Sequence, residues 1–170
     1  MTLNEALERL LRAFERYYNI RREDVTPPFQ AEAEFLQHDE RYFLTRSVKL
    51  SESDARETVY FATVEALDAA TFARLDEAAW RDGLSRLTPR WGHRAADVRL
   101  VILTNRLEAD AAEAIRRTSR SKGYAFSLKG WSNYRLIAME LPTGTVVTNR
   151  LGRPLKDALR KILQSKGIET

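Results

Sequence analysis

The stretch VRLVILTN, at residues 98–105, restricts the possible folds of this chain more than any other segment. Five of its first six residues are apolar, so it lacks the apolar–polar alternation of a strand with one face in water. An apolar run of this length is typical of a strand covered on both faces. We therefore expect it at the centre of a sheet that has helices packed on both sides.

Four segments have the apolar spacing of amphipathic helices. The first has Thr2 and Glu5 at the spacing of a capping box, and Asp68 is expected to cap the second. The third carries acidic residues early and basic residues late, and we expect it to end at Gly123, in line with the helix dipole and a glycine C-cap. The expected helices cover residues 2–18, 68–87, 106–123 and 154–163.

Strand-like runs occupy most of the chain between these helices. The first three are separated by turn-forming residues and predict an antiparallel meander, and the last two predict a hairpin across Pro142, Thr143 and Gly144. The runs cover residues 29–37, 41–50, 58–67, 98–105, 124–130, 133–141 and 145–150. Because the meander is followed by a strand–helix–strand unit, we expect the α+β class, with a mixed sheet and helices on its faces.

The length and composition fit one globular domain over residues 1–170, with a frayed tail over about 164–170. The chain has no cysteine and two histidines, which leaves no disulfide, thiolate zinc site or iron–sulfur cluster. The phosphate-binding motifs GxxxxGK[ST] and GxGxxG are absent, as are the GxSxG and HExxH motifs of hydrolases and metalloproteases. Because no apolar run is long enough to cross a membrane and the N-terminus lacks a signal-peptide pattern, we expect a cytoplasmic protein without a cofactor.

Charge is distributed unevenly along the chain. The net charge is +4, but residues 111–170 hold twelve basic against four acidic residues, a balance of +8, and residues 1–110 hold sixteen against twenty, a balance of −4. Such a distribution suits electrostatic association. The basic part fits nucleic acid, an acidic protein or the acidic part of a second copy, which would give a homo-oligomer.

The sequence RRTSRSKGYAFSLKGW, residues 116–131, contains five basic and three aromatic residues and no acid. This mixture is typical of surfaces that bind phosphates and stack on bases. The same letters fit the basic end of a helix, a turn and a following strand, in which alternation turns Tyr124 and Phe126 inward. Both interpretations stay open, and the candidate nucleic-acid-binding residues are Arg116, Arg117, Arg120, Lys122, Lys129 and Arg135.

A helix, three strand-like runs and a second helix precede VRLVILTNRLEADAAEAIRRTSRSKGYAFSL, in which an Ala-rich helix joins a buried strand to another strand. This order, from Thr2 to about Leu128, resembles the core of the restriction-endonuclease-like superfamily, also called PD-(D/E)xK. In that superfamily a (D/E)xK motif on the third strand, with a further acid on the preceding strand, holds magnesium and positions water to cleave phosphodiesters.

The motif that the resemblance implies is degenerate here. The third strand-like run carries Glu65-Ala66-Leu67, with leucine where the superfamily has lysine, and the second run keeps Lys49 but lacks the acid two residues earlier. Two further carboxylates alternate with apolar residues on the first run, so they share one face and can converge with the others. The candidate catalytic residues are therefore Glu32, Glu34, Lys49 and Glu65, and Mg²⁺ is the only cofactor implied.

We expect a non-catalytic binding module that uses its basic second part on nucleic acid or on an acidic partner. A protein-interaction or self-associating module is the second hypothesis, motivated by the uneven charge and by Trp80, Trp91 and Trp131. A magnesium-dependent, nuclease-like enzyme with an atypical site is the third hypothesis, and it rests on the four candidate catalytic residues.

Overall fold

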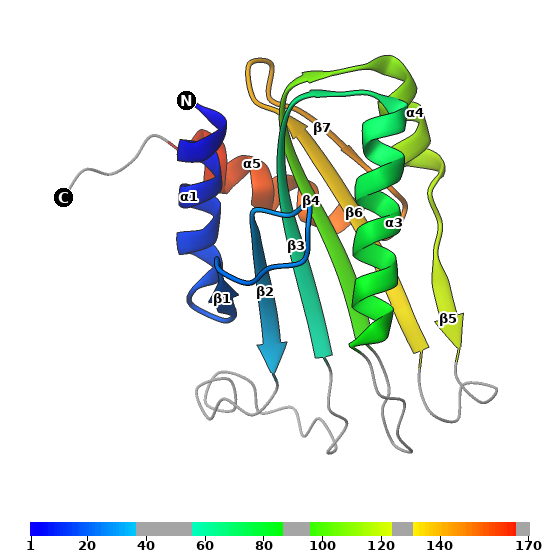
Figure 1. The fold of residues 1–170 in the computed structure, drawn as a ribbon. Helices are drawn as coiled ribbons and strands as arrows, with labels where there is room; N and C mark the ends of the chain where they lie inside the picture. The colour runs from blue at the N-terminus through cyan, green and yellow to red at the C-terminus, as the bar shows by residue number, and fades with distance from the viewer. Residues whose placement is uncertain (37–55, 87–95, 124–130, 166–170) are drawn as a thin grey trace.

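The computed structural model describes residues 1–36, 56–86, 96–123 and 131–165. Its helices are α1 (Leu3–Phe14), α3 (Ala69–Ser85), α4 (Ala109–Arg117) and α5 (Lys156–Gln164), with the 3-10 turn η1 (Arg153–Leu155) before α5. Its strands are β1 (Asn19–Arg21), β2 (Ala31–Leu36), β3 (Arg56–Leu67), β4 (Ala96–Leu107), β5 (Ser121–Gly123), β6 (Trp131–Glu140) and β7 (Thr145–Thr148). These elements form an α+β fold around one mixed sheet (Figure 1).

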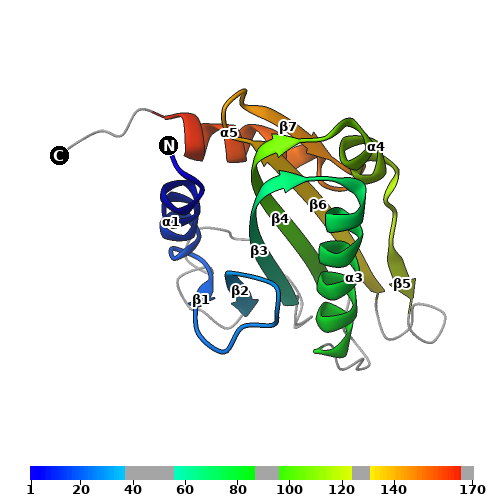
Figure 2. The ribbon, with the colours of Figure 1, turned by 45° about the horizontal axis from the view of Figure 1, so that its top comes forward.

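The strand predicted from residues 98–105 lies at the centre of the sheet, as expected. The strand order is β1-β2-β3-β4-β6-β5, with β7 also paired to β6, and β4 runs parallel to both of its neighbours. Helices α3 and α4 cover one face, and α1 and α5 cover the other (Figures 1 and 2). Leu100 and Ile102 of β4 pack in the α3/α4 core, whereas Val101 and Leu103 pack in the α1/α5 core. Burial on both faces therefore accounts for the unbroken apolar run.

The two predicted helix starts with capping residues are confirmed. Thr2 and Glu5 form the capping box of α1, which ends at Phe14, earlier than predicted. At the start of α3 the Asp68 carboxylate accepts a hydrogen bond of 2.7 Å from the backbone N–H of Thr71. Each bond joins residues three positions apart, so it could be recognised from sequence spacing.

The predicted end of the third helix at Gly123 is wrong. Helix α4 ends at Arg117, and the hydroxyl of Thr118 donates to the carbonyl of Ala114 in its last turn. The backbone at Ser121–Gly123 forms β5, which pairs antiparallel with β6, and this pairing takes the place of further helical hydrogen bonds. The basic end of α4 nevertheless lies where the helix dipole favours cations.

An N-terminal antiparallel meander is present, but its described strands differ from those expected. Strand β2 pairs directly with β3, with Glu32 opposite Tyr60. The strands expected at 41–50 and 124–130 and residues 166–170 of the expected tail fall outside the described residues. Strand β1 was not predicted and pairs with the other edge of β2. The β6–β7 hairpin and the C-terminal helix are confirmed.

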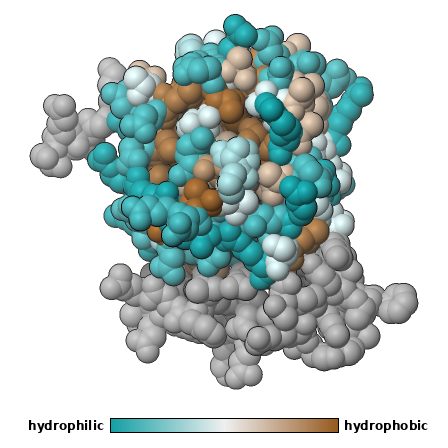
Figure 3. Space-filling model, viewed as in Figure 1, coloured by the Kyte–Doolittle hydropathy of each residue, from teal (hydrophilic) through white to brown (hydrophobic). Residues whose placement is uncertain are grey.

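The α3/α4 side of the molecule carries hydrophilic side chains around a hydrophobic area (Figure 3). Val64 and Leu107, which pack against the core under these helices, are only partly buried.

Within the described part of the chain, no helix has both the length and the apolar character needed to span a bilayer.

Candidate functional site

The predicted acidic residues Glu32 and Glu34 lie on β2, on the side of the sheet that faces α3. Glu32 is only 1% exposed. Its Oε1 accepts a hydrogen bond of 2.6 Å from the backbone N–H of Thr26, and its Oε2 contacts Arg86 Nη2 at 2.7 Å and the guanidinium of Arg21. Donors of the protein itself therefore occupy both oxygens of this carboxylate.

Arg86, at the end of α3, connects the acidic residues of this cluster. Besides Glu32 it contacts Glu34 Oε1 at 3.2 Å and Asp82 Oδ2 at 2.8 Å. The hydroxyl of Tyr60 donates to the same Asp82 carboxylate. Burial first, and then this hydrogen bond, raise the pKa of Tyr60 well above its ordinary value, so the hydroxyl keeps its proton.

The environment of Glu32 favours its ionised form. Burial raises the pKa of Glu32, but the hydrogen bonds from Thr26, Arg21 and Arg86 outweigh burial and hold the pKa below its ordinary value. A buried carboxylate with two guanidinium partners fits a structural ion pair that holds the segment around Thr26 against the sheet.

The predicted convergence of Glu65 with the two β2 carboxylates is wrong. Glu32 lies opposite Tyr60, and Glu65 follows Tyr60 by five positions on β3, roughly 16 Å along the strand and on the other face because side chains alternate. Glu65 is exposed and accepts a hydrogen bond of 2.7 Å from Asn105 Nδ2. Lys49 falls outside the described residues. Within the ranges that the structure describes, no group of three or more His, Asp or Glu side chains gathers in a way that could hold a metal ion.

Two of the predicted basic residues are paired with acids of the helices. Arg117 contacts Glu113 at 2.6 Å, one turn earlier in α4. Arg120 contacts Asp76 at 2.9 Å and Glu77 at 3.3 Å, both on α3. Burial lowers the pKa of Arg120, but the two carboxylates raise it by more, so its charge is retained. These two arginines fit the interpretation of the segment as a helix end that is fastened to α3.

The remaining predicted basic residues do not form one surface. Arg116 is exposed in the last turn of α4 and has no ion pair with any described residue. Arg135 lies on the opposite, α1/α5 face of the sheet, with its Nε 3.3 Å from Asp97 Oδ2. Lys129 and the side chain of Lys122 lie outside the described residues. The sheet therefore separates two of the candidate nucleic-acid-binding residues, Arg135 and Arg116, which lie on its opposite faces.

Two exposed arginines that the sequence analysis missed follow β7. Neither Arg150 nor Arg153 has an ion pair with a described residue, and Leu151 between them is 40% exposed. The sequence NRLGRP contained a signal, because its glycine and proline mark a turn before a helix and turns expose their charged side chains.

Asn149 fastens this turn to the edge of β6. Its Nδ2 donates to the carbonyl of Tyr134 at 2.9 Å, and its Oδ1 accepts from the backbone N–H groups of Leu136 at 3.1 Å and Gly152 at 2.9 Å. These bonds use the part of β6 that lies between its pairings with β5 and β7. A Cβ atom on Gly152 would lie 2.4 Å from the carbonyl oxygen of Leu136, so this close approach requires glycine.

The C-terminal end of α4 lies at the same edge of the sheet. Three residues separate Arg117 from Ser121, which pairs with Asn133 of β6, and such a connection spans at most about 14 Å. Ile115 of α4 and Val147 of β7 belong to the same buried cluster. Figures 1 and 2 show the end of α4 and the turn after β7 at this edge. We call the three exposed side chains here, which have no ion pair with a described residue, the arginine edge: Arg116, Arg150 and Arg153.

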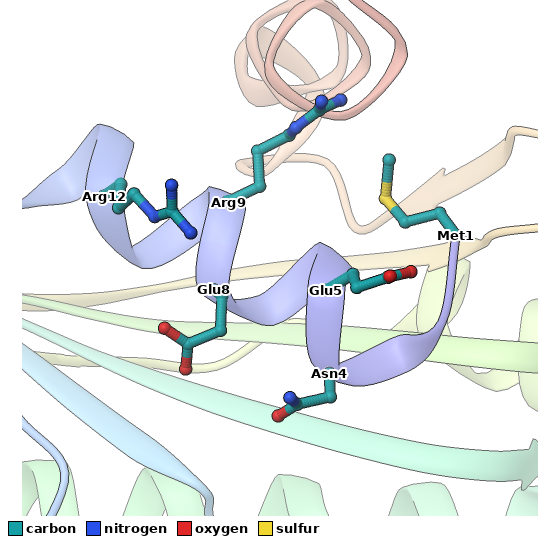
Figure 4. A pocket seen from close by; sticks show the side chains of 6 residues that line it. All are labelled: Met1, Asn4, Glu5, Glu8, Arg9 and Arg12. Carbon is teal, nitrogen blue, oxygen red and sulfur yellow. The ribbon is translucent and has the colours of Figure 1, made fainter. Parts of the chain in front are cut away.

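A pocket on the outer surface of α1 gives less evidence of a function than the arginine edge does (Figure 4). Arg9, which lines it, points from α1 toward α5 and donates to the carbonyls of Leu163 at 3.3 Å and Ser165 at 3.0 Å. Its described lining comes entirely from α1 and the residues before it, namely Met1, Asn4, Glu5, Glu8, Arg9 and Arg12. Because residues of one segment line the described part of this pocket, its shape does not indicate which ligand would fit. The two hydrogen bonds of Arg9 hold the end of α5 against α1.

Comparison with known proteins identifies the family of the chain. Residues 2–161 match the family described as "Domain of unknown function (DUF8052)". The chain belongs to this family. No curated protein and no solved structure matches the chain. Since the family description names no activity, the geometry of the arginine edge carries the functional proposal.

Proposed function

We propose that the protein is a non-catalytic binding module that contacts nucleic-acid phosphates through the arginine edge. The observation that supports this proposal is that Arg116, Arg150 and Arg153 are exposed at one edge of the sheet without a carboxylate partner among the described residues. A surface arginine without an internal partner keeps its charge and its planar set of donors for an external anion. Phosphates suit such donors, and their binding releases counterions.

The edge fits the backbone of a nucleic acid better than its bases. Tyr134, an aromatic residue of the basic part, is fully buried and packs against Trp80 at a ring-centroid distance of 5.4 Å, so it does not present its ring to a base. Leu151 is the apolar residue exposed between the arginines. Phosphate contacts carry no sequence information. We therefore expect binding that depends little on nucleotide sequence.

Fluorescence polarisation of labelled single- and double-stranded DNA and RNA across a salt series tests the proposal. We expect the affinity of the natural protein to fall as salt rises. Changing Arg116, Arg150 and Arg153 together to Ser removes three phosphate contacts. For duplex DNA this should reduce the slope of log K against log salt concentration by about 2.7, at about 0.9 for each contact.

The matched control changes Arg12, Arg16 and Arg74 together to Ser. All three are exposed and none belongs to the arginine edge, and the net charge falls by the same amount. Equal loss of binding in both triple variants would show that net charge alone attracts the nucleic acid and would contradict a site at the edge. Absence of binding at low salt would contradict the whole proposal.

Two outcomes would favour the other hypotheses. If polyglutamate displaces the nucleic acid at equal charge concentration, an acidic protein is the better partner for the same edge. If the labelled probe is shortened only in the presence of magnesium, the nuclease-like alternative gains support. Among the described residues no contact favours that alternative, because both oxygens of Glu32 are occupied and Glu65 lies on the other face.

A further inference from the structure

We propose that a cleft between α1 and α5 binds the aliphatic chain of a short-chain carboxylate whose head group pairs with Arg99 and Arg135. This site lies on the α1/α5 face of the sheet, and its occupation does not depend on the arginine edge. Figures 1 and 2 show α1 and α5 on this same face.

The cleft is apolar except at one position. Eight apolar side chains and Arg99 line it, with Leu10 and Phe14 contributed by α1, Ala158 and Ile162 by α5, and the floor by strands β4 and β6. Its volume is about 50 Å³. Because a water-sized group needs about 10–15 Å³ of such space, the cleft has room for about four methylene or methyl groups. A short aliphatic chain therefore fits, and a long one does not.

The charged side of the cleft offers donors to an anion. Arg99 and Arg135 are register partners on β4 and β6, so their side chains lie next to each other on one face. Arg99 Nη2 is 2.7 Å from Glu57 Oε1, and Arg135 Nε is 3.3 Å from Asp97 Oδ2. These are ion-pair contacts. Within the described structure the buried Nε of each arginine has no acceptor in hydrogen-bond geometry, and Oε1 of Glu57 and Oδ1 of Asp97 have no donor in that geometry.

A carboxylate matches these donors in charge and size. A buried N–H without an acceptor is unfavourable, and an ionised oxygen is the acceptor that guanidinium groups bind most strongly. The two arginines and the carboxylates of Glu57 and Asp97 together carry no net charge. A head group with one negative charge is therefore easier to accommodate than a doubly charged phosphate.

Glu57 can compensate the charge that a bound head group adds. Burial raises the pKa of Glu57; Arg99, the hydroxyl of Tyr18 and Arg135 lower it by less, and Asp97 raises it further. The Tyr18 hydroxyl donates to Glu57 Oε2 at 3.0 Å. Glu57 takes up a proton more readily than an ordinary glutamate does. If it does so when an anion binds, the anion and the four charged residues together again carry no net charge.

Methyl NMR spectroscopy of the labelled protein tests the site. Sodium pentanoate is added while the methyl signals of Val101, Ile137 and Ile162 are followed. We expect saturable shifts with a Kd of about 1 mM, an affinity typical of a ligand of this size. Pentanol and pentylamine, which lack the negative charge, should bind about tenfold more weakly. Decanoate should bind no more tightly than pentanoate because its chain exceeds the cleft.

A cleft-blocking variant and a matched control make the test specific. Ala158 lies at the exposed rim of the cleft, so Ala158→Phe should block the opening without removing any of the four charged residues and should abolish the shifts. Ala73→Phe makes the same change at an exposed position of α3 and should leave binding intact. Shifts that never saturate, equal shifts with pentanol, or unchanged pentanoate binding in Ala158→Phe would each overturn the proposal.

Discussion

Glu32 carries its charge in a place almost closed to water, and its neighbours determine what that charge does. Its alternating position on β2 made it a candidate for catalysis, but donors from Thr26, Arg21 and Arg86 take both of its oxygens. These donors lower the pKa of Glu32 below the ordinary value of 4.5. A lowered pKa means that the folded state holds the ionised form more tightly than the unfolded state does. Glu32 should therefore stabilise the fold above pH 4.5 and lose that contribution as the pH falls through its folded-state pKa.

We expect Glu32→Gln to lower the free energy of unfolding by about 2–3 kcal/mol at pH 7, because it leaves two guanidinium groups without their buried partner. The difference from the natural protein should shrink as the pH falls below 4.5, because the unfolded chain takes up a proton at Glu32 before the folded protein does, and it should be lost once the pH falls through the lowered pKa of Glu32 in the folded state. Urea unfolding followed by circular dichroism at pH 7 and at lower pH measures both quantities. Glu34→Gln is the control, since its partly exposed pair with Arg86 should contribute less than about 1 kcal/mol. A difference that is the same at every pH would contradict the ion-pair interpretation.

At the scale of elements, helix α3 packs closely on β4 at a glycine. A Cβ atom on Gly83 would lie 2.6 Å from Cγ2 of Val98, whose side chain is fully buried. In sequence, a glycine inside a helix indicates only local weakness. The structure shows that the missing side chain allows the helix to approach the sheet, so helix propensity and packing make opposite predictions for this position.

We expect Gly83→Ala to destabilise the protein by about 1–2 kcal/mol, because overpacking against Val98 outweighs the gain of about 1 kcal/mol in helix propensity. In a Val98→Ala background the clash is removed, and the same substitution should become neutral or stabilising. Thermal unfolding of the four proteins of this double-mutant cycle measures the coupling. If Gly83→Ala were stabilising in the natural background as well, α3 would lie farther from β4 than the structure indicates.

At the scale of the whole molecule, the division of charge along the chain is not a division in space. Strand β6, from the basic part, pairs with β4, and α5 lies on the same face as α1. Ion pairs also join the two parts, since Arg120 contacts Asp76 and Arg135 contacts Asp97. Part of the positive charge that could attract a second copy is therefore neutralised inside one molecule.

We expect the protein to sediment as a monomer from low salt up to about 1 M salt, where the Debye length falls to about 3 Å. Sedimentation velocity at several protein concentrations measures this. A dimer that forms at low salt and dissociates at high salt would contradict the expectation and would support the self-associating module. A dimer that persists at high salt would point instead to an apolar interface.

The sequence alone determined the features whose causes are local. The contiguous apolar residues of β4 predicted a central strand, because burial on both faces removes the need for alternation. The starts of α1 and α3 were predictable because a capping side chain bonds within three residues, and the β6–β7 hairpin because its turn residues have restricted conformations. The basic end of α4 followed from the helix dipole.

Only the tertiary structure decided which distant segments meet. The direct pairing of β2 with β3, and the strand instead of a helix end at Ser121–Gly123, depend on which sheet edges are available. The ion-pair partners of Glu32 are Arg21, which precedes it in the sequence, and Arg86, which follows it. No rule of sequence spacing relates these three positions. The arginine edge likewise unites the end of α4 with the turn after β7, because Asn149 fixes that turn to β6. Local patterns reflect bonds between neighbours, whereas these arrangements depend on the packing of the whole sheet.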